Sequence, residues 1–355
     1  MSDTIDDLRI IEIIPLTKPA DIIAEIPRNA DVSKTVTSNR AAIHKILRGE
    51  DDRLIVVIGP CSIHDPIAAR EYAARLTEQR RRFAGDLEIV MRVYFEKPRT
   101  TVGWKGLMND PHLDGSYRIE EGLRIARRLL LDINAMGLPA GVEFLDTITP
   151  QYIADLVSWG AIGARTTESQ IHRQLASGLS CPIGFKNGTD GGVRVALDAI
   201  LAASQPHHFP AVTKDGQAAI ASTTGNEDCH IILRGGKRPN YEAADVEAVT
   251  SDAVKLGVAP RILIDASHAN SGKDPMNQPL VVKSVAAQIA AGNSDVKGMM
   301  IESNLIAGRQ DLVPGRPLVY GQSITDGCIG WDMSVDVLED LAKAVRDRRK
   351  AAFAA

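Results

Sequence analysis

The chain is poor in cysteine and in aromatic residues, and it contains no long uncharged apolar run. Its four cysteines are scattered over 355 residues, which is too few and too dispersed for a disulfide framework. Without an apolar stretch of about 20 residues, or a basic-plus-apolar leader, neither a membrane-spanning helix nor a secretory signal is predicted. The small net charge of −4 argues against nucleic acid and membrane surfaces as partners. We therefore expect a soluble, cytoplasmic protein of a reducing compartment.

What the chain does contain is a series of eight short apolar runs that alternate with helical stretches. They are Leu54–Ile58, Glu88–Val90, Gly141–Val142, Ala161–Ala164, Pro182–Phe185, His230–Leu233, Arg261–Ile264 and Gly298–Ile301. Apolar strands that alternate with helices are typical of a parallel sheet covered by helices. Eight such units predict an α/β fold of the (β/α)8 TIM-barrel class, which accommodates this chain length with extensions.

Two segments are additions to that repeat. Residues 1–50 are predicted as an N-terminal arm and helix that serve regulation or oligomer contacts, and residues 51–355 as the catalytic barrel. In the arm, Ile10–Pro15 could pair as a strand, and Val32–Leu47 is a helix ahead of the barrel. Residues 208–225 alternate in polarity around the turn Lys214-Asp215-Gly216, which predicts an inserted β-ribbon between strands five and six.

Several helix boundaries are visible in the sequence. Asp65-Pro66 is an N-terminal cap before a helix at Ala68–Arg82. Thr149-Pro150 predicts a similar start for a helix at Gln151–Trp159, which Gly160 would end in the left-handed conformation. The final helix, Trp331–Arg349, carries Lys and Arg near its end, where they would face the negative pole of the helix dipole.

Side chains that bind metals follow three neighbouring strands. Cys61, His268 and Glu302 follow strands one, seven and eight, and Asp326 comes from the next loop. The carboxyl ends of the strands in such a barrel meet at one face, where active sites lie. One divalent ion accepts thiolate, imidazole and carboxylate together, and manganese, iron or cobalt suit such a site, with zinc as an alternative. The competing interpretation is a buried free cysteine beside unrelated polar residues.

Cations follow other strands. They are Arg92, Lys97, Arg99, Arg165, Lys186 and Arg234. Arginine offers bidentate hydrogen bonds to phosphate or carboxylate, and lysine a point charge, so a phosphorylated substrate is predicted. Glycine-rich turns at residues 186–192 and 234–237 would allow close approach to an anion. The alternative is that these cations pair with Glu143, Asp146 and Asp190 at the rim.

Seven motifs carry a resemblance to a known family. They are Gly59–Asp65, Met91–Thr101, Gly163–Ser169, Gly184–Asp190, Ile232–Lys237, Asp265–Asn270 and Ser323–Asp326. Together they resemble type I 3-deoxy-D-arabino-heptulosonate 7-phosphate (DAHP) synthase. The resemblance implies a metal-dependent condensation of phosphoenolpyruvate with erythrose 4-phosphate at the start of aromatic amino-acid biosynthesis.

The resemblance also implies residue roles. Metal ligands would be Cys61, His268, Glu302 and Asp326; phosphoenolpyruvate would bind Arg92, Arg165, Lys186, Arg234 and His268; and erythrose 4-phosphate would bind Lys97, Pro98, Arg99 and Thr100. Catalytic residues would be Lys97, Cys61, Glu143 and Asp326. Lys97 is the candidate acid for the new hydroxyl, whereas Glu143 and a metal-bound water both remain candidates for handling the attacking water.

Regulated members of that family share an arm and a ribbon. The resemblance implies an aromatic amino-acid effector and a homodimer or homotetramer, with a pocket built from Asp6, Asp7, Phe144, Pro150, Gln151, Leu175, Leu179, Ser180, Phe209 and Ala211. The arm and the Cys229-His230 step are more similar to the phenylalanine-sensitive form. Ala211 departs from the residues expected there, which leaves tyrosine and tryptophan open. The plain alternative is that these residues pack helices and a hairpin.

Two rival functions remain. One is 3-deoxy-octulosonate 8-phosphate synthase, a related barrel that has Asn where Pro98 stands and lacks the arm and the ribbon. The other is a non-catalytic barrel that senses a phosphometabolite; such a protein would be expected to lack a ligand or a phosphate-binding cation, and none is missing here.

Overall fold

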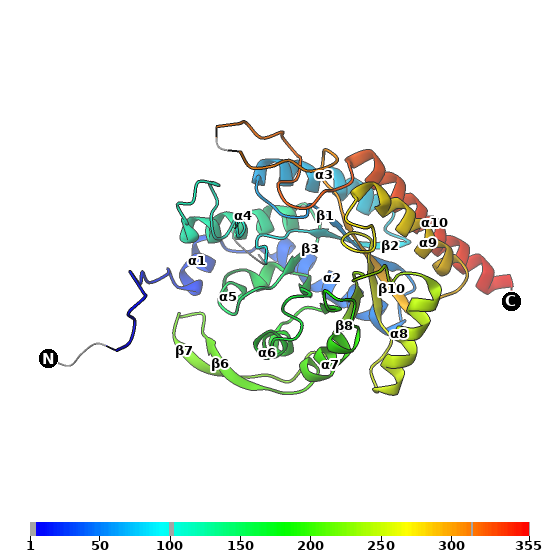
Figure 1. Ribbon diagram of the computed structural model, residues 1–355, viewed down its shortest axis with the longest axis horizontal. Coiled ribbons are helices and arrows are strands. Elements are labelled where there is room, and N and C mark those ends of the chain that lie inside the picture. The colour runs from blue at the N-terminus through cyan, green and yellow to red at the C-terminus, as the bar shows by residue number, and fades with distance from the viewer. Residues whose placement is uncertain (1–4, 99–102, 314, 355) are drawn as a thin grey trace.

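A closed barrel of eight parallel strands forms the centre of the computed structural model, which describes residues 5–98, 103–313 and 315–354 (Figure 1). The barrel strands are β1 (Leu54–Gly59), β2 (Leu87–Arg92), β3 (Ala140–Glu143), β4 (Trp159–Ile162), β5 (Ile183–Lys186), β8 (His230–Leu233), β9 (Ile262–Asp265) and β10 (Val296–Glu302). Around the barrel they follow the order β1-β10-β9-β8-β5-β4-β3-β2. The predicted TIM barrel is confirmed, because strands buried on both faces read as continuous apolar runs.

Helices surround the barrel on its outside (Figure 1). They are α3 (Pro66–Arg82), α4 (Ile119–Ala135), α5 (Pro150–Ile153), α6 (Gln170–Gly178), α7 (Arg194–Ala203), α8 (Ala243–Lys255), α9 (Gln278–Ala290) and α10 (Trp331–Ala354), preceded by α1 (Pro19–Glu25) and α2 (Ala30–Arg48). Short 3-10 turns, η1 (Ala154–Leu156) and η2 (Pro275–Asn277), follow α5 and precede α9. The cap predicted for α3 is confirmed, since the Asp65 carboxylate accepts hydrogen bonds from the amides of Ile67 and Ala68.

The helix predicted at Gln151–Trp159 is wrong. Only α5 and η1 form there, and Trp159 begins β4. Gly160 is a strand residue, not a helix terminator, and an added Cβ would lie 2.6 Å from both Ile183 Cδ1 and Phe144 Cε2. The glycine is required by packing between neighbouring strands, a constraint that has no local signal in the sequence.

The helix α2 closes the N-terminal end of the barrel. Its Ile43, Ile46 and Leu47 are buried together with side chains of β1 and β9, including Ile55 and Leu263. This apolar face of the helix is therefore part of the barrel core. The arm that precedes α1 differs: Ile10–Pro15 forms no strand, and Ile11, Ile13 and Ile14 are exposed.

The inserted ribbon is confirmed as an antiparallel pair, β6 (His208–Val212) and β7 (Ala218–Ser222), between β5 and β8 in the chain. The turn contains Gly216 at φ 75°, a conformation that favours glycine. Thr223 hydrogen-bonds Ser177 of α6 at 2.7 Å, and the Lys214 carbonyl accepts from the amide of Ala20 at 2.8 Å. These contacts hold the ribbon against α6 and α1.

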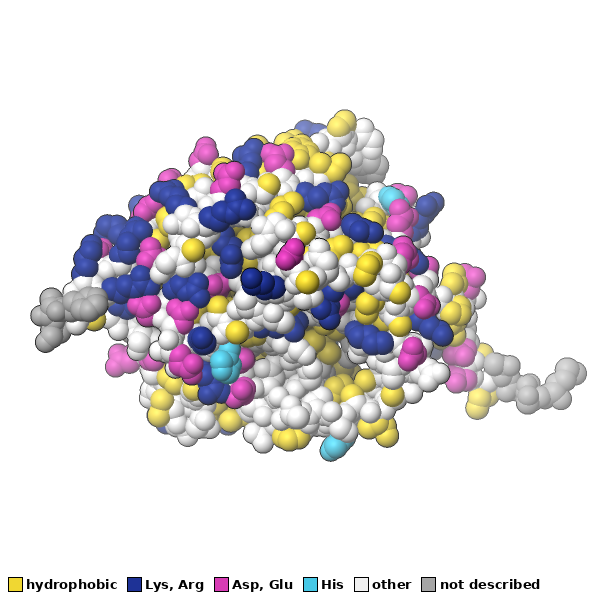
Figure 2. Space-filling view, turned by 180° about the vertical axis from the view of Figure 1, so that it is seen from behind, with side chains coloured by type: hydrophobic (Ala, Val, Ile, Leu, Met, Phe, Trp, Pro, Cys, Tyr) yellow, Lys and Arg dark blue, Asp and Glu magenta, His cyan; other side chains and the backbone are white. Residues whose placement is uncertain are grey.

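The end of the chain carries many cations, which Figure 2 shows interspersed with acids on the opposite face of the molecule. Arg349 pairs with Asp52 and Asp86, and Arg346 with Glu339. Because α10 continues to Ala354, these residues do not occupy its last turn. Ion pairs, rather than the helix dipole expected from the sequence, explain their placement. Every helix among the described residues is too short or too polar to cross a membrane.

Candidate active site at the barrel mouth

A cavity of about 530 Å³ lies at the carboxyl ends of the barrel strands. Five of the six predicted cations line it: Arg92, Lys97, Arg165, Lys186 and Arg234. The predicted Pro98, Glu143, His268, Glu302 and Asp326 line it as well. The sixth cation, Arg99, and Thr100 lie outside the described residues. Residues distant in sequence therefore meet at one mouth, as the strand ends predicted.

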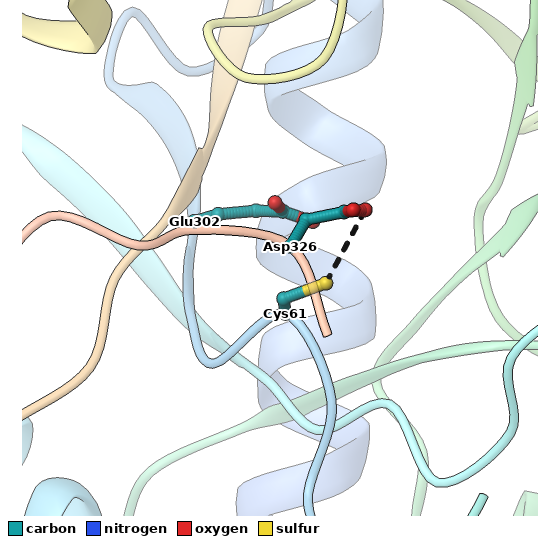
Figure 3. Close-up of side chains that lie close together, drawn as sticks. All are labelled: Cys61, Glu302 and Asp326. Atoms are coloured by element: carbon teal, nitrogen blue, oxygen red, sulfur yellow. Dashed lines mark hydrogen bonds between the residues drawn. The ribbon is translucent and has the colours of Figure 1, made fainter. Parts of the chain in front are cut away.

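Cys61, Glu302 and Asp326 form a compact group of potential metal ligands (Figure 3). Their ligand atoms all lie within 4.8 Å of one another, and Cys61 Sγ is 3.7 Å from Asp326 Oδ2. Cys61 follows the end of β1, Glu302 is the last residue of β10, and Asp326 comes from the loop before α10. Burial and the neighbouring Glu302 carboxylate raise the pKa of the Cys61 thiol to about 11. A soft sulfur beside two carboxylates is a donor set that suits a first-row divalent ion.

His268 lies at the edge of this group rather than within it. Its Nε2 is 3.9 Å from Glu302 Oε1, and its Nδ1 is 2.8 Å from Asp265 Oδ2 and 2.7 Å from the Ser267 hydroxyl. The residue has φ 57°, a left-handed conformation that only a few per cent of non-glycine residues adopt. Such local strain is characteristic of functional positions. The Asp265 and Ser267 contacts leave Nε2 as the nitrogen on the Glu302 side.

Arg92 is buried beneath the cavity. Its guanidinium donates to Glu302 Oε1 at 2.9 Å and to the carbonyls of Pro60 and Cys61, and its Cζ lies 3.6 Å from the centre of the Tyr94 ring. A buried arginine with an acid and several carbonyl acceptors stays charged and fixed in direction. It therefore presents a pre-oriented positive charge to the mouth.

Lys97 reaches across the mouth to Cys61. Its Nζ lies 3.0 Å from the Cys61 carbonyl oxygen and 3.1 Å from Cys61 Sγ. Burial opposes the charged ammonium, but the charges of Cys61 and Glu302 outweigh it and raise the pKa of Lys97. This side chain is therefore a fixed, protonated group beside the sulfur.

Asp265 is a functional residue that sequence reasoning missed. It is fully buried, and its carboxylate accepts from Lys186 Nζ at 3.0 Å as well as contacting His268. Burial works against its ionisation, but His268 and Lys186 outweigh burial and hold the pKa of Asp265 well below its usual range. The available signal was an acid directly after the apolar run 261–264. Lys273 and Arg309 also line the cavity and were not predicted.

The two glycine-rich turns pack against each other. A Cβ added to Gly236 would lie 2.2 Å from the Gly191 amide nitrogen, so no side chain fits there. Asn187 ties the same two turns together by accepting from the Arg234 amide at 2.8 Å and donating to the Gly235 carbonyl. The contact between the two loops therefore requires glycine at Gly236. The same loops place Lys186 and Arg234 on one side of the mouth.

Two of the rim acids considered as partners for the cations accept hydrogen bonds from backbone amides. Asp190 accepts from the amide of Gly192, and Asp146 from the amides of Ile148 and Thr149. Arg92 and Lys186 instead pair with the buried Glu302 and Asp265.

The residues predicted for an effector pocket lie on the segment from β3 to α5, on α6 and the loop after it, on the ribbon strand β6, and on the N-terminal arm. Phe144, Pro150, Leu175 and Phe209 are buried, on β3–α5, α6 and β6. Gln151, Leu179, Ser180 and Ala211 belong to the same elements and their loops. Asp6 and Asp7 are exposed on the arm, which projects away from the barrel (Figure 1).

The comparisons with known proteins agree with this geometry. The sequence profile of the DAHP synthetase I family matches residues 28–339. A curated relative from Escherichia coli (strain K12), named phospho-2-dehydro-3-deoxyheptonate aldolase, Phe-sensitive, is 61% identical over 344 residues, which cover 97% of this chain and 98% of the relative. A Trp-sensitive relative from Enterobacter agglomerans is 56% identical over 343 residues, covering 97% and 99%. The solved phospho-2-dehydro-3-deoxyheptonate aldolase of Francisella tularensis SCHU S4 superposes with a TM-score of 0.94 at 52% identity, covering 96% of this chain and 99% of that one.

Proposed function

The chain belongs to the DAHP synthetase I family and is a DAHP synthase, and on this premise we propose how the mouth of its barrel performs the reaction. A DAHP synthase joins phosphoenolpyruvate, erythrose 4-phosphate and water to give DAHP and phosphate, the first step of the shikimate pathway. The observation that carries the assignment of roles is the meeting of Glu302 and Asp326 with five cations in one cavity, with the buried Cys61 sulfur beside the two carboxylates. Two phosphorylated substrates would bring their negative charges to that set of cations.

Cys61, His268, Glu302 and Asp326 would hold one divalent ion. The residues fit such an ion: three ligand atoms lie within 4.8 Å of one another, and the His268 Nε2 is 3.9 Å from one of them. The mixed sulfur, nitrogen and oxygen donors favour manganese, iron or cobalt, with zinc as an alternative. When bound, the ion supplies Lewis-acid polarisation of the aldehyde oxygen of the aldose.

Phosphoenolpyruvate would bind on the cationic side of the mouth. Arg165, Lys186 and Arg234 would hold its phosphate, and Arg92 with Lys186 its carboxylate, with His268 alongside. Arg92 and Lys186 are suited to this because their acid partners fix their directions from beneath. Groups that are held in place before the substrate arrives need no reorganisation in the transition state.

Erythrose 4-phosphate would bind beside Lys97 and Pro98, with Arg99 and Thr100 completing its phosphate site. Attack by C3 of the enol on the aldehyde carbon turns the aldehyde oxygen into a hydroxyl, to which Lys97 would give a proton. Water then adds at C2, and Glu143, which lines the cavity, would accept its proton. Cleavage of the bond between C2 and the phosphate oxygen then releases phosphate and leaves the C2 ketone of DAHP. Holding both substrates at a fixed separation is itself worth about 7–11 kcal/mol for well-oriented groups.

The direct test is product formation from purified protein. We expect DAHP from phosphoenolpyruvate and erythrose 4-phosphate, loss of activity with chelator, and recovery when manganese, iron or cobalt is added back. Arabinose 5-phosphate is the matched substrate control, because the rival octulosonate synthase would prefer it. Turnover that persists after complete removal of metal would contradict the metal site while leaving the enzyme assignment intact.

We further propose a homodimer or homotetramer regulated by an aromatic amino acid, with phenylalanine favoured over tryptophan and tyrosine. The relatives named above include both Phe-sensitive and Trp-sensitive proteins, and the Phe-sensitive one is more similar. The exposed Asp6 and Asp7 would come from a neighbouring subunit to a pocket between Phe144, Leu175 and Phe209. Inhibition by each amino acid in turn tests this, and insensitivity to phenylalanine would contradict it. A cytoplasmic location is proposed from the biosynthetic role.

A further inference from the structure

Glu96 is a buried acid beside the catalytic mouth that the mechanism does not use. Only 6% of it is exposed. Its carboxyl accepts from the Thr149 hydroxyl at 3.3 Å, while the Asp146 carboxyl accepts from the amide of the same Thr149 at 2.7 Å, so Thr149 brings the two carboxyl groups together. Thr149 and Asp146 belong to the loop between β3 and α5, whereas Glu96 belongs to the segment after β2. The contact therefore joins two of the loops that surround the mouth.

Two carboxyl groups can share a hydrogen bond only if one of them carries a proton. Asp146 is already engaged as an acceptor, since its Oδ1 receives the amides of Ile148 at 2.6 Å and Thr149 at 2.7 Å. This arrangement favours the proton on Glu96, with Asp146 as its acceptor. Burial and the Asp146 carboxylate raise the pKa of Glu96 to about 8, so the acid is largely neutral at pH 7.

The segment that Glu96 anchors carries groups of the mouth. Glu96 forms an isolated antiparallel bridge with Gly106, and the Lys97 amide donates to the Lys105 carbonyl at 2.8 Å. A Cβ on Gly106 would lie 2.0 Å from the Phe95 carbonyl oxygen, so the two backbone segments joined by this bridge are in direct contact. Directly after Glu96, Lys97 turns into the cavity, and Pro98 lines it. A shift of Glu96 would therefore move both residues.

We propose that the neutral Glu96 carboxyl, by donating to Asp146, is a positioning group that holds Lys97 and Pro98 in place for the aldose substrate. Ionisation of Glu96 turns this contact into a repulsion between two carboxylates and releases the segment. The charged groups around Glu96 are Asp146 and Glu143 from the β3 side, Lys97 on its own segment and Lys105 across the bridge. The proposal rests on the proposed function in one respect, the assignment of Lys97 and Pro98 to the aldose.

The test compares the wild-type enzyme with Glu96→Gln and Glu96→Ala, each loaded with manganese. The KM values for erythrose 4-phosphate and for phosphoenolpyruvate are measured from pH 6.5 to pH 9.5. If only the protonated form is competent, the wild-type KM for the aldose rises about tenfold at one pH unit above the pKa of the carboxyl. Glu96→Gln, whose amide still donates to Asp146, keeps the KM of pH 7 and loses that alkaline rise. Glu96→Ala has a raised KM at every pH, with the phosphoenolpyruvate KM little changed.

Glu247→Gln on α8 is the matched control, because it removes an exposed carboxylate far along the chain. It should reproduce the wild-type pH profile. The same alkaline rise in Glu96→Gln as in the wild type would overturn the proposal, and so would a KM in Glu96→Gln that equals that of Glu96→Ala.

A second measurement does not depend on the proposed function. The folded-state pKa of Glu96 lies above the value of an unfolded glutamic acid, so its contribution to stability is complete at low pH and is lost as the pH rises toward 8. The difference in Tm between Glu96→Gln and the wild type should therefore grow from pH 5 to pH 8 and then stay level. A constant difference would mean that Glu96 does not hold the proton. If the Tm difference grows as predicted but the KM for erythrose 4-phosphate does not change with pH in the wild type, the assignment of Lys97 and Pro98 to the aldose would be contradicted.

Discussion

The two ends of the barrel are built from different kinds of side chain. At the N-terminal end, α2 inserts Ile43, Ile46 and Leu47 among the strands, and the contacts are apolar. At the C-terminal end, Arg92, Lys186 and Asp265 are buried as ions that pair with each other or with Glu302. Burial of apolar area stabilises the fold, whereas buried ion pairs contribute little to stability or reduce it. We therefore infer that the apolar end supplies stability, whereas the charges of the mouth serve the proposed chemistry.

The largest effect is expected when a cysteine at the C-terminal end of the barrel is compared with a cysteine at the N-terminal end. Cys61→Ala removes the soft ligand of the proposed metal site, and we expect kcat to fall by about a thousandfold or more, since metal polarisation is worth several kcal/mol. Cys181→Ala is the control, because Cys181 is equally buried but precedes β5 at the opposite end. That variant should keep its kcat. Full activity of Cys61→Ala with one bound metal per chain would remove Cys61 from the ligand set.

A change at the apolar end should have the opposite signature. Ile43→Ala leaves a cavity where α2 meets the strands, and large-to-small changes of this kind cost about 2–5 kcal/mol of the free energy of unfolding. We expect a lower Tm and an unchanged kcat at temperatures where the variant is folded. Denaturation curves and initial rates on the same sample separate the two effects. A loss of kcat without a loss of stability would mean that α2 takes part in the chemistry.

Within the mouth, Arg165 distinguishes the two anion sites. Arg165→Ala should raise the KM for phosphoenolpyruvate about 10- to 100-fold, because hydrogen bonds to charged groups are worth about 1.5–3 kcal/mol. The KM for erythrose 4-phosphate should change far less. Steady-state kinetics with each substrate varied in turn provide the measurement. The reverse pattern would exchange the two proposed sites.

The sequence predicted the strands and most of the mouth because both depend on local order. An apolar run followed by Cys61, Lys186 or Glu302 marks the end of a strand and the side chain that reaches the mouth there. Asp265 is missed because the apolar run in the sequence ends at Ile264. The predicted strand Ala161–Ala164 lies two residues later than β4, because Trp159 resembles the end of the helix before it. Glu96 had no local signal, since its proton depends on Asp146, which lies 50 residues further along the chain.

Two histidines show the same contrast between the ends on a smaller scale. At the mouth, His268 Nδ1 contacts the Asp265 carboxylate. At the other end, His230 begins β8, fully buried, with Nε2 accepting from the indole nitrogen of Trp159 at 3.1 Å and Nδ1 contacting the Asp228 carbonyl at 3.0 Å. An imidazole that accepts at one nitrogen and donates at the other must be neutral. Burial lowers the pKa of His230 to about 4.

Because His230 is neutral in the folded protein, we predict a modest loss of the free energy of unfolding in mild acid. Because the unfolded state binds the proton more readily than the folded state, stability is complete above the unfolded pKa of about 6.5 and declines as the pH falls toward 4. At pH 5.5 the loss amounts to about 1 kcal/mol relative to pH 7.5. His230→Asn should be less stable at pH 7.5 but should lose less on acidification, and denaturant midpoints at the two pH values measure the difference. An identical acid response in both proteins would mean that His230 takes up its proton in the folded state, and the contrast between the two ends would then not extend to their histidines.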